Sequence, residues 1–222
     1  EIQKIYPQEE SQLADVWSKY MPSDRYDCGN IDFCNDGDKL HSIKTLEDFM
    51  SEKILLIDGH SILNRAFYGL PDLTNSEGKH TGAVYGFLNI LLRTIEEEKP
   101  QYLTVAFDLK APTFRHKMFE AYKGTRKPMP EELREQVPLI KEMLTAMGVN
   151  VVTKEGYEAD DILGTLARKS EAAGMDATIL SGDRDLLQLA TDKVMIRLPK
   201  TVRGKTTIED YHAQQVIEKY QV

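Results

Sequence analysis

Gly156-Tyr157-Glu158-Ala159-Asp160-Asp161 is the stretch around which the chain is organised. It places three carboxylates within four residues, just where an apolar helical pattern begins at Ile162. On a helix, Glu158 and Asp161 share a face because they are three residues apart, whereas Asp160 points elsewhere. Carboxylates this close repel one another, and their pKa values rise unless something positive lies between them. Acids also suit an ordinary helix N-terminus, so this stretch alone leaves a structural interpretation open.

Three other segments are typical of buried β-strands, and each leads into acidic residues. They are residues 53–57 before Asp58, residues 102–107 before Asp108, and residues 177–180 before Asp183 and Asp185. Near-continuous apolar runs of this length indicate parallel strands buried on both faces. Ligands of open parallel α/β sheets bind beyond the carboxyl ends of the strands. We therefore expect an α/β fold, with a mostly parallel central sheet flanked by helices and the acids converging on one rim.

The remaining pattern supplies further helices and strands around this sheet. Apolar spacing predicts helices over 81–98, 130–147 and 209–220, strands over 149–152 and 194–198, and a hairpin or turn over 200–207. A Gly-containing loop is expected over 69–82.

Seven acids are expected to meet at the rim and the adjoining helix start: Asp58, Asp108, Glu158, Asp160, Asp161, Asp183 and Asp185. Hard oxygen ligands without a His or Cys set favour Mg²⁺ or Mn²⁺ over zinc. A site with two such ions stabilises the attacking and leaving oxygens of an in-line phosphoryl displacement. No Ser-His-Asp or Cys-His arrangement is indicated, and the His residues read as structural or exposed. The pattern therefore favours metal-assisted phosphodiester hydrolysis.

Residues 110–127 form a basic stretch with aromatic side chains interleaved. The cations are Lys110, Arg115, Lys117, Lys123, Arg126 and Lys127, and the rings are Phe114, Phe119 and Tyr122. Cations that meet phosphates and rings that stack on bases suit a single nucleic-acid strand. A solvated charged surface is the alternative, but the position directly after Asp108 favours nucleic acid.

The acidic total charge of −8 does not argue against this partner. Residues 1–50 hold eleven acids and five bases, so most of the excess lies there. Without the seven candidate ligands, residues 51–222 carry a net charge of about +5.

From about Met50 onward, the chain resembles the N-terminal 5′-nuclease domains of bacterial DNA polymerase I, in the flap endonuclease/5′–3′ exonuclease superfamily. The matching motifs are Leu56 to His60, Arg65 to Tyr68, Ala106 to Asp108, Phe114 to His116, Tyr122 to Arg126, Gly156 to Asp161, and Ser181 to Leu186. Their order and spacing match over roughly three quarters of the chain.

The resemblance implies a resolvase-like or PIN-like core and a structure-specific 5′–3′ exonuclease or flap endonuclease. Its substrate would be DNA with a 5′ flap or 5′ end, in replication and repair, with two Mg²⁺ or Mn²⁺ ions in the complete domain. The implied catalytic residues are Asp58, Asp108, Lys123, Arg126, Glu158 and Asp160. Asp183 would complete the first metal site, and Asp161 and Asp185 would serve the second. The implied DNA contacts are Arg65, Arg115, Tyr122, Lys123 and Arg126.

The resemblance also divides the chain. Residues 1–49 are an acidic N-terminal extension of unknown origin, and residues 50–222 form the nuclease core. In the family, a helix–three-turn–helix region with two further acids follows, and a polymerase domain is expected beyond it. Without that region we expect poor or absent cleavage. With two cysteines, no membrane-spanning run and no signal-peptide pattern, we expect a cytoplasmic protein without a membrane partner.

Two alternatives remain open. One is a non-catalytic DNA-binding fragment of the same fold, which would bind without turnover. The other is a metal-dependent ribonuclease or phosphatase, because sheets rimmed by carboxylates host several chemistries.

Overall fold

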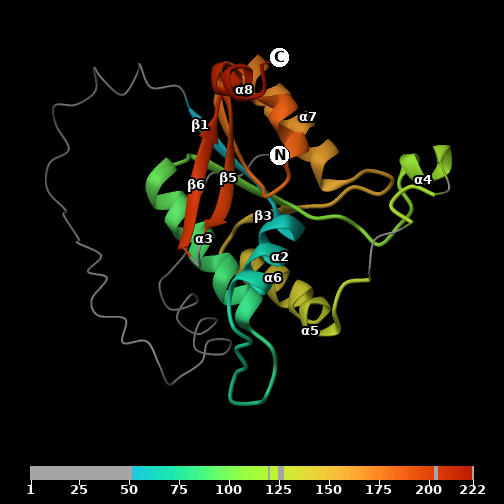
Figure 1. The fold of residues 1–222 in the computed structure, drawn as a ribbon. Coiled ribbons are helices and arrows are strands. Elements are labelled where there is room, and N and C mark those ends of the chain that lie inside the picture. Colours follow the sequence, from blue (N-terminus) through green and yellow to red (C-terminus); the bar gives the residue numbers. More distant parts are fainter. Residues whose placement is uncertain (1–51, 120, 125–127, 203–204, 222) are drawn as a thin grey trace, which may run out of the picture.

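A six-stranded sheet forms the centre of the protein (Figure 1). The structure is a computed structural model that describes residues 52–119, 121–124, 128–202 and 205–221; the predicted extension 1–49 lies outside this range. The sheet order is β3-β2-β1-β4-β5-β6, in which all neighbours pair in parallel except β5 and β6. The strands are β1 (Lys53–Asp58), β2 (Tyr102–Ala106), β3 (Asn150–Val152), β4 (Asp176–Leu180), β5 (Val194–Val202) and β6 (Lys205–Tyr211). The predicted fold class is confirmed.

Helices cover both faces of the sheet. They are α2 (Gly59–Gly69), α3 (Gly82–Glu98), α4 (Phe114–Met118), α5 (Glu131–Arg134), α6 (Gln136–Ala146), α7 (Ala159–Ala172), the 3₁₀ helix η2 (Arg184–Leu189) and α8 (Ala213–Tyr220). One core cluster joins the sheet to α2, α3 and α6, and the other joins it to α7 and η2. Helix α4 stands to one side of the body, at the end of long connections (Figure 1).

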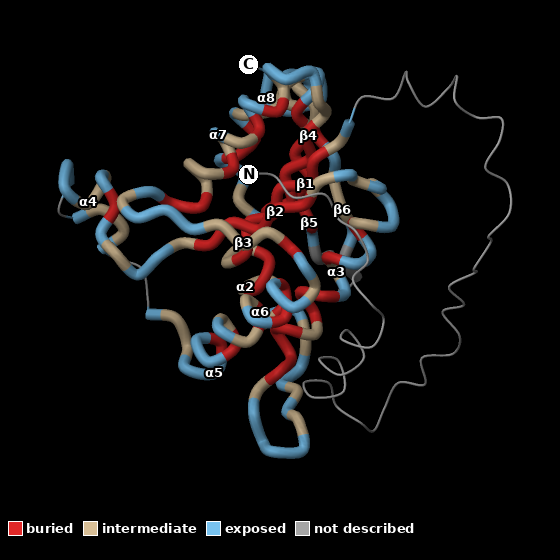
Figure 2. Tube along the Cα trace, turned by 180° about the vertical axis from the view of Figure 1, so that it is seen from behind, coloured by how far each residue is buried: buried red, intermediate tan, exposed pale blue. Residues whose placement is uncertain are grey.

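Strand β1 shows why the apolar runs are continuous. Leu55 and Ile57 pack in the core beneath α3 and α6, whereas Ile54 and Leu56 pack in the core beneath α7. Successive side chains of a strand point to opposite faces, so a strand covered on both sides needs apolar residues at every position. Figure 2 shows the buried positions concentrated on the central strands.

Three parts of the expected secondary structure need correction. Helix α2 follows β1 directly and was not expected. The predicted helix 130–147 is two helices, because Pro138 has no amide hydrogen to donate and therefore fits only in the first turn of α6. The predicted helix 209–220 begins only at Ala213, since residues 209–211 continue β6, where Tyr211 is buried in the core.

A buried arginine ties the antiparallel strand β6 to helix α3. The Arg197 guanidinium, on β5, donates to both oxygens of Asp210 at 2.8 and 3.0 Å. It also contacts Glu97 at 2.9 Å and Glu98 at 3.1 Å. Its side chain is only 9% exposed, so the three carboxylates compensate for the lost hydration of the cation.

Replacing Arg197 should therefore destabilise the fold strongly. We expect Arg197→Met to lower the free energy of unfolding by about 3 kcal/mol, because three carboxylates, of which Glu98 is only 8% exposed, lose their contacts with the guanidinium. Arg93→Met is the control, since Arg93 contacts the same Glu97 at 2.8 Å but is 61% exposed, and it should cost less than about 1 kcal/mol. Urea unfolding measures both, and equal losses would contradict the assignment.

Candidate metal centre

The carboxyl ends of three neighbouring strands bring acids together. Asp58 is the last residue of β1, and Asp108 and Asp183 follow the ends of β2 and β4. Strand β1 lies between β2 and β4, and the chain switches there from one half of the sheet to the other. Ligands of open α/β sheets bind at such a switch point.

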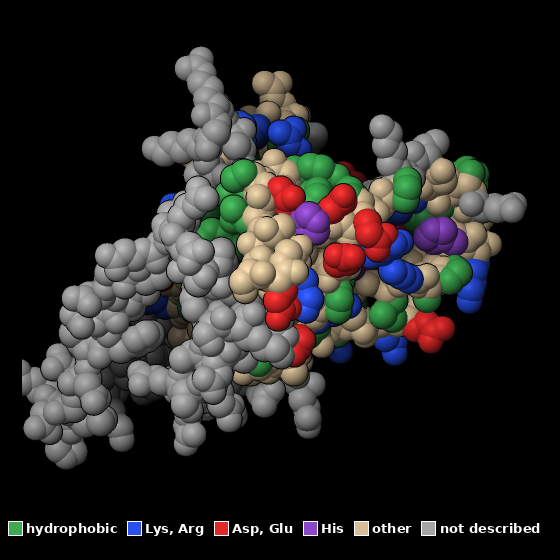
Figure 3. Space-filling view, turned by 90° about the horizontal axis from the view of Figure 1, so that it is seen from below, with side chains coloured by type: hydrophobic (Ala, Val, Ile, Leu, Met, Phe, Trp, Pro, Cys, Tyr) green, Lys and Arg blue, Asp and Glu red, His purple; other side chains and the backbone are tan. Residues whose placement is uncertain are grey.

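Five of the seven predicted ligands line one pocket of about 270 Å³ at this rim. They are Asp58, Asp108, Glu158, Asp160 and Asp183, and the other lining residues are His60, Ser61, Asn64 and Lys123. Figure 3 shows acidic side chains gathered near a histidine on one face, with basic side chains beside them.

Asp58 is held by two serines that the sequence interpretation missed. Its Oδ1 accepts from the Ser61 amide at 3.0 Å, which caps α2, and its Oδ2 accepts from Ser181 Oγ at 2.9 Å. Ser61 Oγ in turn accepts from the Gly182 amide at 2.9 Å, which links the β1 and β4 ends. Burial raises the pKa of Asp58, and the hydrogen bonds oppose that shift. The available signal was position in the sequence, because Ser61 directly follows the Leu56–His60 motif and Ser181 is the first residue of the Ser181–Leu186 motif.

Asp108 connects its strand to the N-terminus of α7. Its Oδ1 accepts from the Ala159 amide at 2.7 Å, while its own amide donates to His60 Nδ1 at 3.2 Å. Because Nδ1 accepts that bond, the 3.7 Å approach of His60 to the Asp108 carboxylate is not an ion pair. Burial lowers the pKa of His60, which favours the neutral form of the ring. The histidine read as structural or exposed is thus part of the pocket wall.

Asp160 is a partly buried acid of the pocket with a strongly raised pKa. Burial raises its pKa to about 7, and the charges of Asp58, Asp183 and Asp108 push it in the same direction. A cation among these oxygens would relieve that repulsion, so the donor set fits a hard divalent ion such as Mg²⁺.

Glu158 is surrounded by donors from the basic stretch. Its Oε1 accepts from Lys123 Nζ at 2.8 Å, and its Oε2 accepts from the Tyr122 hydroxyl at 3.2 Å. Arg115 Nη1 lies 3.6 Å from Oε2. Within the described part of the chain, no group of three or more His, Cys, Asp and Glu side chains is arranged to hold an ion. The contact with Lys123 gives one physical reason, because it occupies a carboxylate oxygen of the pocket.

Asp161 and Asp185, expected to serve a second ion, are not among the residues that line the pocket. Both oxygens of Asp161 accept from Arg115 at 2.7 Å, and Oδ2 also accepts from the Glu158 amide at 3.0 Å. The bond from Arg115 lowers the pKa of Asp161. Asp185 lies in the exposed first turn of η2, where its amide donates to Asp183 Oδ1 at 2.9 Å. Their role as ligands stays a prediction.

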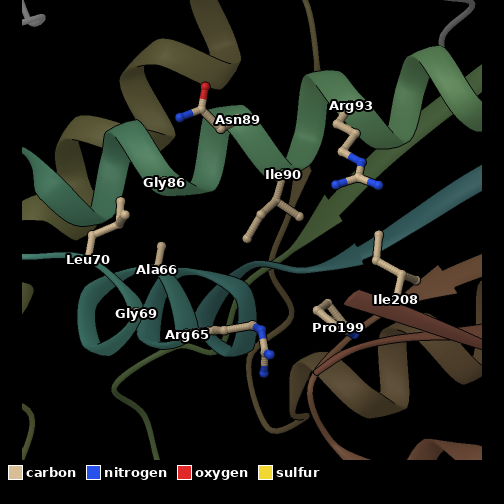
Figure 4. A pocket seen from close by; sticks show the side chains of 10 residues that line it. All are labelled: Arg65, Ala66, Gly69, Leu70, Gly86, Asn89, Ile90, Arg93, Pro199 and Ile208. Atoms are coloured by element: carbon tan, nitrogen blue, oxygen red, sulfur yellow. The ribbon is translucent and has the colours of Figure 1, made fainter. Parts of the chain in front are cut away.

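The expected DNA contacts are divided between two places. Arg115, Tyr122 and Lys123 all contact Glu158. Arg65 instead lines a separate cavity of about 220 Å³ between α2, α3 and the β5–β6 hairpin. Figure 4 shows its guanidinium on the same side as Pro199, with Arg93 at the other end of the cavity. Arg126 lies outside the described residues.

The fold and this pocket define a class of protein. It is an open α/β domain with an acidic pocket at the switch point of the sheet and part of the basic stretch beside that pocket. Residues 53–221 match the family described as the 5′–3′ exonuclease, N-terminal resolvase-like domain, and the chain belongs to that family.

Similar proteins agree with this assignment. DNA polymerase I of Bacillus subtilis is 48% identical over 169 residues, which are 76% of this chain and 19% of that protein. The chain thus spans about a fifth of this relative's length. The T5 D15 protein co-crystallised with metal ions has a TM-score of 0.58 at 20% identity, over 77% of this chain and 61% of that one. A T5 D15 flap endonuclease complex with DNA and metal ions gives 0.56 at 19% identity, with the same coverage. At these identities the T5 structures show the shared fold.

Among the described helices, none is long and apolar enough to cross a membrane.

The raised pKa of Asp160 predicts how stability depends on pH without divalent ions. The folded state binds this proton more tightly than the unfolded state, whose pKa is near 3.8, so stability falls as pH rises from about 4 through 7. At pH 8 we expect Asp160→Asn to have a free energy of unfolding about 1–3 kcal/mol higher than that of the wild type. This range is already reduced because the side chain is partly solvated. Urea unfolding in EDTA at pH 5 and pH 8 measures it, and a variant that is no more stable than the wild type at pH 8 would contradict it.

The two neighbouring acids should differ in cation binding. We expect Asp160→Asn to weaken Mn²⁺ binding at least about tenfold, because a pocket oxygen is lost. Asp161→Asn should change it by less than about threefold, because Asp161 contacts Arg115 rather than the pocket. Calorimetric titration compares them, and equal losses would place Asp161 among the ligands.

Proposed function

We propose that this chain is the core of a metal-dependent 5′–3′ exonuclease or flap endonuclease that acts on DNA. The observation that carries the proposal is the pocket itself, where five carboxylates from four separate segments meet beside Lys123. Family membership supports the reaction class, and the T5 relative described in complex with DNA and metal ions supports the substrate and the cofactor.

The pocket acids would hold Mg²⁺ or Mn²⁺, and the proposed ligands are Asp58, Asp108, Glu158, Asp160 and Asp183. A divalent ion there supplies positive charge against the phosphate oxygens as the phosphodiester is hydrolysed. The two serines fix the orientation of Asp58, and the first amide of α7 fixes that of Asp108. A second, weaker ion with Asp161 and Asp185 as ligands belongs to the same proposal. It would require Asp161 to release Arg115, so the tighter Mn²⁺ binding step in the pocket should not depend on Asp161.

The basic segment, which we define as residues 114–119 and 121–124, would bind and orient the substrate. Lys123 Nζ reaches the pocket and can donate to an oxygen of the phosphate under attack. Arg115 stacks on the Phe114 ring at 4.5 Å, and Phe114 lies 5.8 Å from the Tyr157 ring, so cations and exposed rings occur together. Such a surface suits an unpaired strand. Arg65 and Arg126 are proposed as further phosphate contacts.

The larger protein is part of the proposal. Because the matched residues make up only 19% of the DNA polymerase I chain, we propose a polymerase domain in the same protein and a role in replication and repair. A cytoplasmic location follows from that role.

The decisive experiment is cleavage of end-labelled DNA with a 5′ flap. We expect product only with Mg²⁺ or Mn²⁺, and at least about a hundredfold less product with Asp108→Asn. Asp192→Asn is the matched control, since it neutralises an exposed acid next to β5, away from the pocket. Cleavage that is unchanged in Asp108→Asn, or faster on RNA or small phosphate esters, would overturn the proposal.

The second candidate is a DNA-binding domain without turnover. The contacts of Lys123 and Arg115 favour it, because each occupies a carboxylate of the acidic cluster. Flap binding in gel-shift assays, with no product at any Mn²⁺ concentration, would support this candidate over the nuclease.

A further inference from the structure

The basic segment is attached to the start of α7 by two ion pairs of different character. Arg115 pairs with Asp161 through two bonds of 2.7 Å, outside the residues that line the pocket. Lys123 pairs with Glu158 through one bond of 2.8 Å, inside the pocket. The same segment is therefore fixed at one point and reaches into the acidic centre at another.

The two ion pairs should differ in how readily another cation can replace the side-chain cation at the carboxylate. A bidentate arginine–carboxylate pair has a fixed geometry and both oxygens occupied, whereas a lysine ammonium is a single charge on a flexible stem. Glu158 is also the more contested carboxylate, since Tyr122 and Arg115 approach its second oxygen. Its side chain is only 9% exposed, so removal of Lys123 would leave a nearly buried charge that needs another cation.

The backbone conformation at Lys123 is unusual and positions its side chain for the contact with Glu158. Its φ is +57°, in the left-handed region that side-chain-bearing residues seldom adopt. Two successive turns surround it, with the Tyr122 amide bonded to Phe119 and the Gly124 amide bonded to Ala121 at 3.0 Å each. These turns place the Lys123 side chain where it contacts Glu158 at 2.8 Å.

We propose that Lys123 is a built-in competitor for divalent cations at Glu158, and that cation binding displaces it. This inference rests on the proposed function, because it assumes that the pocket holds such an ion. The Arg115–Asp161 pair keeps the segment attached while the Lys123 ammonium leaves Glu158. The displaced ammonium then faces the pocket as a donor for a phosphate.

The competition couples cation and DNA binding. Anything that draws Lys123 away from Glu158 should strengthen cation binding, and by reciprocity the cation should strengthen phosphate binding through Lys123. Lys123 thus neutralises part of the acidic centre until a divalent cation binds there.

Direct Mn²⁺ titration of the whole chain by calorimetry tests the proposal without reference to activity. We expect Lys123→Met to bind Mn²⁺ at least about fivefold more tightly than the wild type. Lys141→Met is the matched control, because Lys141 also places a positive charge near Asp108 but packs on the Phe107 ring, 4.7 Å from its centroid. The Mn²⁺ affinity of the Lys141→Met variant should differ from that of the wild type by less than about twofold. Equal gains in the two variants would mean that general charge, not competition, sets the affinity, and would overturn the proposal.

A double-mutant comparison locates the competition at Glu158. In a Glu158→Gln background, Lys123→Met should no longer increase Mn²⁺ affinity, because the contested carboxylate is gone. A gain as large as that in the wild-type background would overturn the proposal. Amide exchange adds a structural readout. Mn²⁺ should increase exchange in a peptide that contains Tyr122 and Gly124 in the wild type, but not in Lys123→Met, and unchanged or slower exchange in the wild type would count against displacement.

The same titrations separate this inference from the proposed function. If wild-type binding is weakened by Asp160→Asn but unaffected by Lys123→Met, the metal site stands and the competition is refuted. If Mn²⁺ binds with the same affinity in the wild type and Asp160→Asn, the metal site itself is refuted and the inference falls with it.

Discussion

Electrostatic repulsion among the carboxylates is the constraint on which the site depends. Parallel pairing fixes β2, β1 and β4 side by side, so the acids at their ends cannot move apart. The fold therefore stores an unfavourable charge cluster, which hydrogen bonds from Ser61, Ser181 and the α7 amide relieve only in part. The rest of the relief must come from protons or cations. This explains why a basic segment is folded against the acids.

The start of α7 joins these opposing charges. Glu158 and Asp161 form a reciprocal cap at its first turn, and each also holds a cation from the basic segment. Asp160, between them in sequence, faces the pocket. Asp160 and Asp161 therefore have different partners within one helical turn, because a step of one residue rotates a side chain by about 100°.

Much of this arrangement could be predicted from the sequence. Apolar runs that end in Asp58, Asp108 and Asp183 specify parallel strands and a shared rim, since strand direction fixes where the ends lie. Contacts that depend on side-chain geometry could not be predicted. The pairing of Asp161 with Arg115 depends on the path of a long loop, which the sequence pattern does not specify. Residues 209–211 carry a helical pattern but form a strand, in which the side chain of Tyr211 is buried. Arg65 illustrates the same limit, because one residue along α2 separates the acidic pocket from a different cavity.

The two borders of the sheet bear on how the protein behaves at high concentration. Unpaired strand edges are templates for association between chains, and short or charged edges oppose it. On one border, β3 has only three residues. On the other, β6 carries Glu209 in contact with Lys200 and Lys219, so a neighbouring strand would have to displace ordered charges. Both borders of the described sheet thus carry features that oppose edge-to-edge pairing.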